Sequence, residues 1–361
     1  MNRWLAGPVV LVLLVLAGCT APAAPGRLTG GAASTAAPSA SSVATEGRPG
    51  AAPARVRIGW RTPAVSDGAL LLADERGYFQ ELGLRIEYVP VNTTPAMMAP
   101  LAQGQLEVAT GGINAALWNA VANDVPIKIV ADKGSMTQPF QTFMVRQDLV
   151  DQIHDWTDLR GRRIAINGTG TSDHLALLKA LARGGLTERD VDVTTMPWPD
   201  MGPAFANGAI DVGISLEPLQ TRFAAEGIAQ KWRGLDELSP NQQTAAIFYG
   251  PQFAATDAAT RFMVAYLRGA RDYNDAFVKG IGREEVIAVF LKRIPGVERA
   301  LYDQMAMPGI NPNGRVDVAS IAEDMRAYVA TGTVRQAVDV TTVVDHRFAD
   351  AAVQLLGGEY R

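Results

Sequence analysis

The sequence predicts an α/β protein made of two units, each a mainly parallel sheet flanked by helices, followed by a helical C-terminal part. Three observations lead to this fold class. Short apolar runs typical of strands alternate with helical stretches, as in parallel sheets covered on both faces. This alternation occurs twice, and long helical stretches follow it. The chain has 361 residues, and roughly 100 to 200 residues per domain favours two units over one.

The first unit begins with a strand at residues 56–60 and a helix at about 67–82. This helix ends at Gly83, because glycine readily adopts the left-handed conformation just past a helix end. Thr94 and Pro95 suit the N-cap and the first position of the next helix, which ends near Gly104. Further strands are expected at residues 84–91, 106–109 and 127–131, and a further helix at residues 114–122.

The second unit repeats the alternation. Its expected strands are residues 163–167, 191–196 and 210–215, with a helix at residues 172–183 between the first two. Asp200 and Pro218 mark two further helix starts. A strand-like run at residues 244–249 is followed by long helices at 258–279 and 318–330, the second with Asp317 as its N-cap.

Composition excludes several classes of protein. The chain is 48% hydrophobic and 19% charged, the balance of a globular protein with a sizeable core. Its net charge is −4 and it has no long basic run, which disfavours nucleic acid as a partner. The three histidines, His154, His174 and His346, follow no metal-ligand spacing. There is no Gly-x-Ser-x-Gly elbow and no phosphate-binding P-loop. We therefore expect no enzyme activity, no metal and no cofactor.

The N-terminal segment is typical of an exported lipoprotein. Arg3 precedes an apolar run at residues 4–16, which is shorter than the roughly 20 residues that span a bilayer. The run ends in Leu-Ala-Gly followed by Cys19, the only cysteine of the chain. We predict a lipoprotein signal peptide at 1–19, with Cys19 lipidated after cleavage; the alternative is a plain signal peptide or membrane anchor with an incidental cysteine. Residues 20–53 are rich in Ala, Pro, Ser, Thr and Gly and are expected to form a disordered linker.

Candidate ligand-binding residues follow the predicted strands. In open parallel sheets, ligands bind beyond the carboxyl ends of strands, where helix N-termini present free N–H groups. Four strand-to-helix junctions supply the candidates, which are Trp60, Arg61, Ser66 and Asp67; Gly111, Gly112 and Asn114; Gly168, Thr169, Thr171 and Ser172; and Glu217.

These residues also suit purely structural roles. Gly111 and Gly112 fit a tight turn, and Thr171 or Ser172 fits a helix N-cap. Glu217 fits an ordinary carboxylate near a helix N-terminus. The loop at residues 167–173 has a Gly-x-Gly, but Asp173 occupies the place of the third glycine of a dinucleotide fingerprint, which disfavours a nucleotide site.

Several segments form a pattern along the chain: LAQGQLEVA at 101–109, PIKIVA at 126–131, WTDLRGRRI at 156–164 and AIDV at 209–212, together with residues 56–59, 72–79 and 82–84. In this order they resemble the nitrate, sulfonate, taurine and thiamine-pyrimidine binding proteins of ABC importers. The resemblance extends over nearly all of residues 55 to 335. It implies a two-lobed type II periplasmic-binding-protein fold, with lobe I at 54–140 and 248–361 and lobe II at 141–247. The crossovers are then expected near Gln138 to Phe143 and Thr244 to Pro251.

The resemblance also implies a function. A monomer anchored on the extracytoplasmic face of the membrane would capture a small polar ligand by lobe closure and present it to an ABC permease with its ATPase. In the pyrimidine-binding branch of that family an acidic residue followed by proline matches Glu217 and Pro218. This favours a nitrogenous ligand, with an aromatic side chain such as Trp60 stacked on it.

Three alternatives stay open. A sulfonate, taurine or nitrate ligand would use the N–H donors of the glycine-rich helix N-termini. Pyrimidine-precursor synthases share the fold and are enzymes, but they carry a cysteine-rich iron motif, whereas Cys19 is the sole cysteine here. A binding module that serves signalling rather than import is the third alternative.

Overall fold

The computed structural model describes residues 53–61, 64–91 and 93–361, which belong to one compact unit. The predicted signal peptide with Cys19, and the linker up to residue 52, lie outside the described residues and stay predictions. Within the described ranges, none of the helices combines the length and the apolar character needed to cross a membrane.

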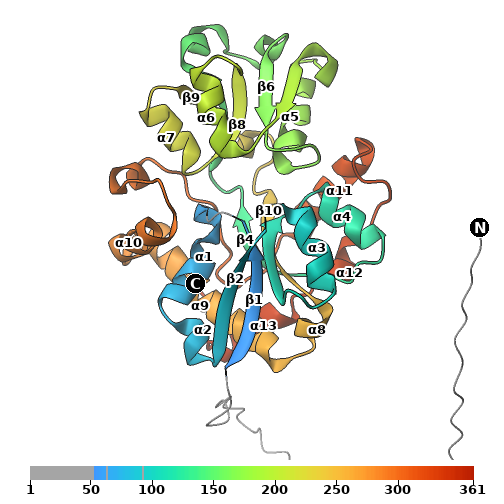
Figure 1. Cartoon of the computed structure of the whole chain (residues 1–361), viewed down its shortest axis with the longest axis vertical. Helices are drawn as coiled ribbons and strands as arrows, with labels where there is room; N and C mark the ends of the chain where they lie inside the picture. Colours follow the sequence, from blue (N-terminus) through green and yellow to red (C-terminus); the bar gives the residue numbers. More distant parts are fainter. Residues whose placement is uncertain (1–52, 62–63, 92) are drawn as a thin grey trace, which may run out of the picture. The chain divides into compact units, whose positions relative to one another are not determined.

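The first sheet has five strands in the order β2-β1-β3-β10-β4 (Figure 1). β1 pairs in parallel with β2 and β3, whereas β10 is antiparallel to both β3 and β4. Four strands therefore run in one direction and β10 runs against them. The bounds are β1 Ala54–Trp60, β2 Leu84–Pro90, β3 Val108–Gly112, β4 Lys128–Ser135 and β10 Gln243–Tyr249.

The second sheet repeats this plan in the order β7-β6-β8-β5-β9. β6 is parallel to β7 and β8, and β5 is antiparallel to β8 and β9. The α/β fold class, with two mixed sheets flanked by helices, is thereby confirmed. The bounds are β5 Gln141–Arg146, β6 Arg163–Ile166, β7 Asp192–Thr195, β8 Val212–Leu216 and β9 Ala229–Gly234. β5 and β9 were not among the strands expected from the sequence.

The chain passes between the sheets twice, through residues 136–140 and through residues 235–242. The second crossover expected near Thr244 to Pro251 is wrong, because residues 243–249 form β10 and pair on both sides within the first sheet. Below, lobe I is the first sheet with the helices packed on it, and lobe II is the second sheet with its helices.

In lobe I, two helices replace the single one expected at 67–82. α1, Gly68–Glu75, and α2, Tyr78–Glu81, are separated at Gly77, whose φ of 75° breaks the helix. α9, Asp257–Phe277, packs closely on α1, since a Cβ at Gly269 would lie 2.1 Å from the carbonyl oxygen of Ala69. The other helices are α3 Thr94–Ala102, α4 Ala115–Ala122, α8 Pro251–Ala254, α10 Arg283–Arg293, α11 Val318–Ala330, α12 Val340–Val343 and α13 Arg347–Leu355.

The helix starts show which capping predictions hold. Asp317 caps α11 as predicted, and its side chain accepts from the N–H of Ser320. The cap of α3 is Thr93 and not Thr94, which is the first helical residue. In lobe II, α6 begins at Trp198 rather than Asp200, and Pro218 is the N-cap of α7 rather than its first residue. The lobe II helices are α5 Ser172–Arg183, α6 Trp198–Ala206 and α7 Leu219–Ala225.

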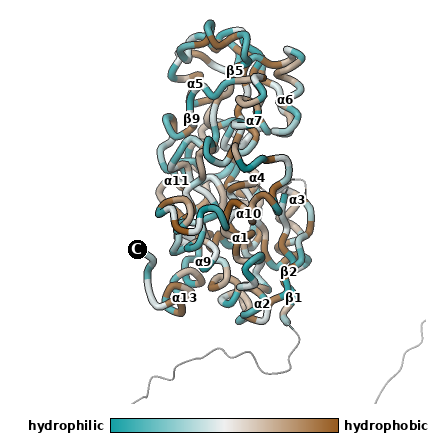
Figure 2. Tube along the Cα trace, turned by 90° about the vertical axis from the view of Figure 1, so that its left-hand side faces the viewer, coloured by the Kyte–Doolittle hydropathy of each residue, from teal (hydrophilic) through white to brown (hydrophobic). Residues whose placement is uncertain are grey.

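Apolar side chains fill both faces of each sheet. In lobe I one cluster joins β1 to α1 and α9, and a second joins β3 to α3, α4 and α11. The hydrophobic colour in Figure 2 is correspondingly strong around α1, α3 and α4. In lobe II one cluster lies against α5 and another against α6 and α7. Burial of this apolar surface is the main favourable contribution to folding.

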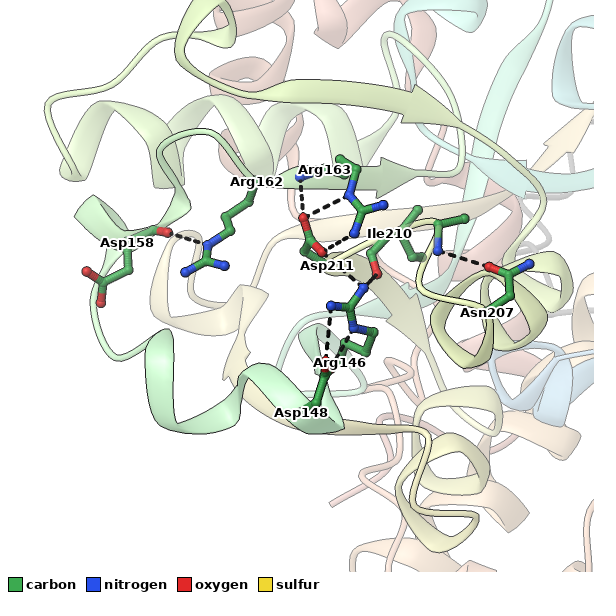
Figure 3. A network of polar contacts seen from close by, with 9 residues as sticks. Arg146, Asp148, Asp158, Arg162, Arg163, Asn207, Ile210 and Asp211 are labelled. Atoms are coloured by element: carbon green, nitrogen blue, oxygen red, sulfur yellow. Dashed lines mark hydrogen bonds and ion pairs between the residues drawn. The ribbon is translucent and has the colours of Figure 1, made fainter.

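A cluster of charged side chains around Asp211, the polar clamp, joins the N-terminal ends of β6 and β8 (Figure 3). Both oxygens of Asp211 accept from Arg163, and Arg146 Nη1 lies 3.1 Å from Asp211 Oδ1. Burial raises the pKa of Asp211, but the Arg163 hydrogen bonds and charge outweigh it and hold that pKa below its usual value. Arg163 and Asp211 belong to the WTDLRGRRI and AIDV segments, so these segments serve the architecture of lobe II.

Candidate functional site

Two loops predicted to bind ligand meet between the lobes. The N–H of Ala115, the first residue of α4 in lobe I, donates to the carbonyl oxygen of Gly170 in lobe II at 2.9 Å. A Cβ at Gly170 would lie only 2.9 Å from the Cβ of Ala115. The loop that ends at Asn114 and the loop at residues 168–172 are therefore in direct contact.

A second contact joins the loop after β1 to lobe II. The guanidinium carbon of Arg61 lies 5.2 Å from the ring centroid of Trp198, the first residue of α6. This is a cation–π distance, and such pairs contribute about 0.5 to 1 kcal/mol at exposed sites. The region bounded by these two contacts is the candidate ligand site.

On lobe I, two residues that follow Arg61 in the chain, Ser66 and Asp67, take part in a buried ion-pair cluster. Lys133 Nζ lies 2.8 Å from Asp67 Oδ1 and donates to Ser66 Oγ at 3.2 Å. Asp67 Oδ2 also accepts from the N–H of Ala64. Ser66 and Asp67 are both bound to Lys133, which was not among the residues selected from the sequence, and their contact with a ligand stays a prediction. Lys133 is 66 residues away from Asp67 in the chain, and no local pattern connects the two.

The other lobe I candidates have protein partners. The ring of Trp60 packs on Tyr88 with centroids 4.2 Å apart. Gly111 allows close packing, because a Cβ there would lie 3.0 Å from Thr94 Oγ1, and one at Gly112 would lie 3.6 Å from a backbone oxygen. Asn114 Oδ1 accepts from the N–H of Leu117 and so caps α4.

The lobe II loop at residues 168–172 is held in shape by its own hydrogen bonds. Thr171 Oγ1 lies 2.7 Å from both Asn167 Oδ1 and the Gly168 carbonyl oxygen, and it accepts from the N–H of His174 at the start of α5. The N–H of Gly170 donates to His174 Nδ1 at 3.1 Å. His174 Nε2 therefore carries the ring proton in the neutral form and donates to Glu188. Thr169 is exposed, and Ser172 is the first residue of α5.

Glu217 lies apart from these loops and is completely buried. Its Oε1 lies 2.8 Å from Lys231 Nζ, Gln220 Nε2 and Thr221 Oγ1, and accepts from the N–H of Ala306 at 3.3 Å. Ala306 belongs to the segment between α10 and α11, so Glu217 links β8 of lobe II to a lobe I segment. Its predicted contact with a ligand stays a prediction.

Asp173, like Lys133, was not among the candidate residues selected from the sequence. Its carboxyl is completely buried; Oδ2 accepts from Trp198 Nε1 at 2.9 Å and Oδ1 from Gln141 Nε2 at 3.2 Å. Burial raises its pKa to about 7, against the hydrogen bonds of Trp198 and Asn167 and the charge of Arg61, which lower it. In the sequence, Asp173 looks like an ordinary acidic residue in the first turn of a helix, and its burial leaves no local signal.

A hollow of about 340 Å³ lies elsewhere, lined among others by Thr142, Lys231, Trp232, Arg233 and Gln304. A second, of about 310 Å³, shares Lys231 and Gln304 with it. None of the predicted ligand-binding residues lines either hollow. We place the candidate site at the interlobe contacts, because the charged and polar side chains of both lobes converge there.

Comparisons with known proteins agree with the fold. A putative binding protein of Brucella abortus (strain 2308) is 25% identical over 229 residues, which are 61% of this chain and 67% of that protein. The structure of the alkanesulfonate-binding protein SsuA from Xanthomonas axonopodis pv. citri, bound to MOPS, matches with a TM-score of 0.67 at 20% identity. That match covers 82% of this chain and 99% of SsuA. The periplasmic nitrate-binding protein NrtA from Synechocystis PCC 6803 matches with a TM-score of 0.66 at 13% identity, over 84% of this chain and 89% of NrtA.

The sequence profile of one family matches residues 67–275, which is more than half of the chain and includes strands and helices of both lobes. The chain therefore belongs to the NMT1/THI5-like family.

Proposed function

We propose that this protein is the extracytoplasmic solute-binding component of an ABC importer and has no enzyme activity of its own. The observation that carries the proposal is the pair of interlobe contacts, Ala115 to Gly170 and Arg61 to Trp198. They bring loops from the carboxyl ends of strands in both sheets to one place, which is where ligands bind in sheets of this kind. Lobes joined by two crossovers can close on a ligand by a hinge motion.

The relatives support the same reading. The SsuA and NrtA structures are described as sulfonate- and nitrate-binding proteins, and the Brucella relative as a putative binding protein. The proposed ligand of this chain is a small polar molecule held between the lobes, with Arg61, Ser66, Asp67, Asn114 and the 168–172 loop around it. Aliphatic sulfonates, taurine and nitrate are the alternative to a nitrogenous ligand.

A thermal-shift screen of the purified full-length chain tests this function. Sulfonates, nitrate, bicarbonate, amino acids and thiamine pyrimidines are the compounds to test. A ligand at 100 times its Kd should add about 2.7 kcal/mol to the free energy of unfolding. Uptake of the same compound, labelled, should fall when the gene is deleted. The proposal would be contradicted if none of the compounds stabilised the protein and the deletion strain still took up all of them at the wild-type rate.

The proposed anchor is a lipid on Cys19, which would hold the protein at the membrane close to its permease. The support for it is the position of the chain's only cysteine directly after an apolar run and small residues. The variant Cys19→Ser should lose radiolabelled palmitate and leave the membrane fraction. Unchanged labelling and membrane association of Cys19→Ser would contradict it.

A further inference from the structure

The Asp173 carboxylate is buried without a cation bonded to it. It is fully inaccessible, and its hydrogen-bond donors are the indole of Trp198, the amide of Gln141 and the N–H of Asn167 at 3.4 Å. Among the described residues, no lysine, arginine or histidine nitrogen forms an ion pair with it. Within the part of the chain that the structure describes, the charge of Arg61 acts on Asp173 and lowers its pKa, and the Arg61 guanidinium lies over the face of Trp198. Buried carboxylates are normally paired, since an isolated one is costly.

A second acceptor without a partner lies beside this carboxylate. The Gln141 side chain donates through Nε2 to Asp173, which fixes the orientation of its amide and identifies the other branch as the carbonyl oxygen. Gln141 is 4% exposed, and within the described part of the chain its Oε1 has no hydrogen-bond partner. Buried polar atoms are bonded in the great majority of cases, so this oxygen has an acceptor position available to a donor from outside the chain.

The two groups are at the candidate site. Gln141 is the first residue of β5, directly after the first crossover, and Asp173 lies in the first turn of α5, directly after the loop that contacts Ala115. Trp198, which donates to Asp173 with its ring edge, receives Arg61 of lobe I on its ring face. Asp173 and Gln141 therefore lie next to the residues that join the two lobes. The carbonyl oxygen of Gln141 only accepts hydrogen bonds, and so does the Asp173 carboxyl in its ionised form.

We propose that Asp173 and Gln141 form a subsite for a planar nitrogen cation of the ligand, an amidinium or guanidinium group. This inference rests on the proposed function and specifies its ligand. Such a group supplies the missing positive charge and presents parallel N–H donors, which a carboxylate and a neighbouring carbonyl oxygen can accept together. A sulfonate or nitrate placed here would face two acceptors and is disfavoured. The subsite thus selects against the anions bound by proteins of similar fold.

Isothermal titration of the purified full-length chain with benzamidine, agmatine, MOPS, taurine, nitrate and 4-amino-5-hydroxymethyl-2-methylpyrimidine tests the subsite. We expect benzamidine or agmatine to bind and the two anions, MOPS and nitrate, to bind at least tenfold more weakly. Asp173→Asn, which removes the charge and keeps the shape, should weaken binding of the cation about 10- to 100-fold. Gln141→Leu, which removes the second acceptor, should weaken it about tenfold.

The control is Asp211→Asn. Asp211 is also a buried carboxylate of lobe II, but it is paired with Arg163 and Arg146 and lies outside the candidate site. This variant should bind the cation like the wild type. Binding confined to the anions, taurine or the pyrimidine overturns the inference and leaves the proposed function intact, as does cation binding that Asp173→Asn does not change. Failure of every compound to bind overturns the inference as well. The uptake assay on the deletion strain then decides the proposed function separately.

Discussion

The backbone N–H of Ala115 donates a 2.9 Å hydrogen bond to the carbonyl oxygen of Gly170. The bond joins the first turn of α4 in lobe I to the loop before α5 in lobe II. It occupies one of the N–H groups that a helix leaves free at its N-terminus. Two loops far apart in the sequence are thereby held together, and a residue with a side chain at position 170 would disturb this contact.

Gly170→Ala should weaken this contact between the lobes. Gly170 has φ of 72°, and a Cβ there would lie 2.9 Å from the Cβ of Ala115. We expect a loss of about 2 to 3 kcal/mol in the free energy of unfolding, from backbone strain and overpacking together. The radius of gyration measured by small-angle scattering should rise and ligand affinity should fall, because the lobes no longer meet there.

Gly161→Ala is the matched control. Gly161 also has φ of 72°, but nothing lies within 4 Å of a Cβ built on it. In urea denaturation the free energy of unfolding should therefore fall only by the backbone strain, about 1 kcal/mol. The radius of gyration should equal that of the wild type. Equal effects of the two substitutions on stability and on the radius of gyration would show that the contact with Ala115 does not hold the lobes together.

Asp211→Asn should destabilise lobe II without changing ligand affinity. Asp211 accepts from the backbone and guanidinium of Arg163 and pairs with Arg146, so the substitution weakens several charged hydrogen bonds (Figure 3). We expect a loss of about 2 kcal/mol in urea denaturation. Asp148→Asn is the control, because Asp148 also pairs with Arg146 but its side chain is 67% exposed. Asp148→Asn should leave the denaturation midpoint nearly unchanged. An equal loss of stability in the two variants would show that Asp211 does not stabilise lobe II through its buried ion pairs.

Much of the fold could be predicted because its signals are local. The helix at residues 172–183 and the N-cap Asp317 were predicted at the residues where they occur. β5 and β9 were missed, since their burial patterns reflect neighbours in the sheet rather than a regular alternation along the chain. The antiparallel direction of β10 likewise depends on a crossover whose position no short pattern marks.

The site was predicted less completely than the fold, because its chemistry depends on long-range pairs. The strand ends indicated Ser66 and Asp67, but their cation, Lys133, comes from another strand. Asp173 lies inside the predicted loop segment, yet its role depends on Gln141 and Trp198, 32 and 25 residues away. Partners at such separations follow from the sheet order, which the sequence does not display.

The stability of the protein should fall as the pH rises from about 4 to 7. The unfolded Asp173 carboxyl loses its proton near pH 4, whereas in the folded protein burial raises its pKa to about 7. Between these values the folded state binds more protons than the unfolded state, so the free energy of unfolding decreases with increasing pH. A shift of three pKa units corresponds to about 4 kcal/mol. Asp132 and Asp324, whose pKa values burial raises to about 6, act in the same direction.

Asp173→Asn isolates the contribution of this residue. Asp132 and Asp324 contribute alike to the variant and to the wild type. Between pH 6 and 7 the slope of stability against pH should therefore be smaller in the variant by the contribution of Asp173 alone. Urea denaturation at half-unit pH intervals measures both slopes. Parallel curves for the two proteins across the window would show that Asp173 does not hold its proton in the folded state.

Glu217 and Lys231 form the last pair to test. Lys231 Nζ lies 2.8 Å from Glu217 Oε1, and the carboxylate is fully buried while the lysine side chain is 30% exposed. Lys231→Met leaves the buried charge without its cation and should reduce the free energy of unfolding by about 3 kcal/mol. Glu217→Gln keeps the shape, and Gln220 and Thr221 can still donate to its carbonyl oxygen, so we expect a smaller loss, about 1 to 2 kcal/mol.

Ligand affinity separates a structural role of Glu217 from a direct contact. Its oxygens are engaged by protein donors, so at a temperature where both variants are folded we expect Glu217→Gln and Lys231→Met to bind ligand within about threefold of the wild type, which is a difference below 1 kcal/mol. Titration calorimetry on the two variants measures this directly. A tenfold loss of affinity confined to Glu217→Gln would instead assign Glu217 to the ligand, as its place before Pro218 predicted from the sequence, because Lys231→Met leaves the carboxylate in position.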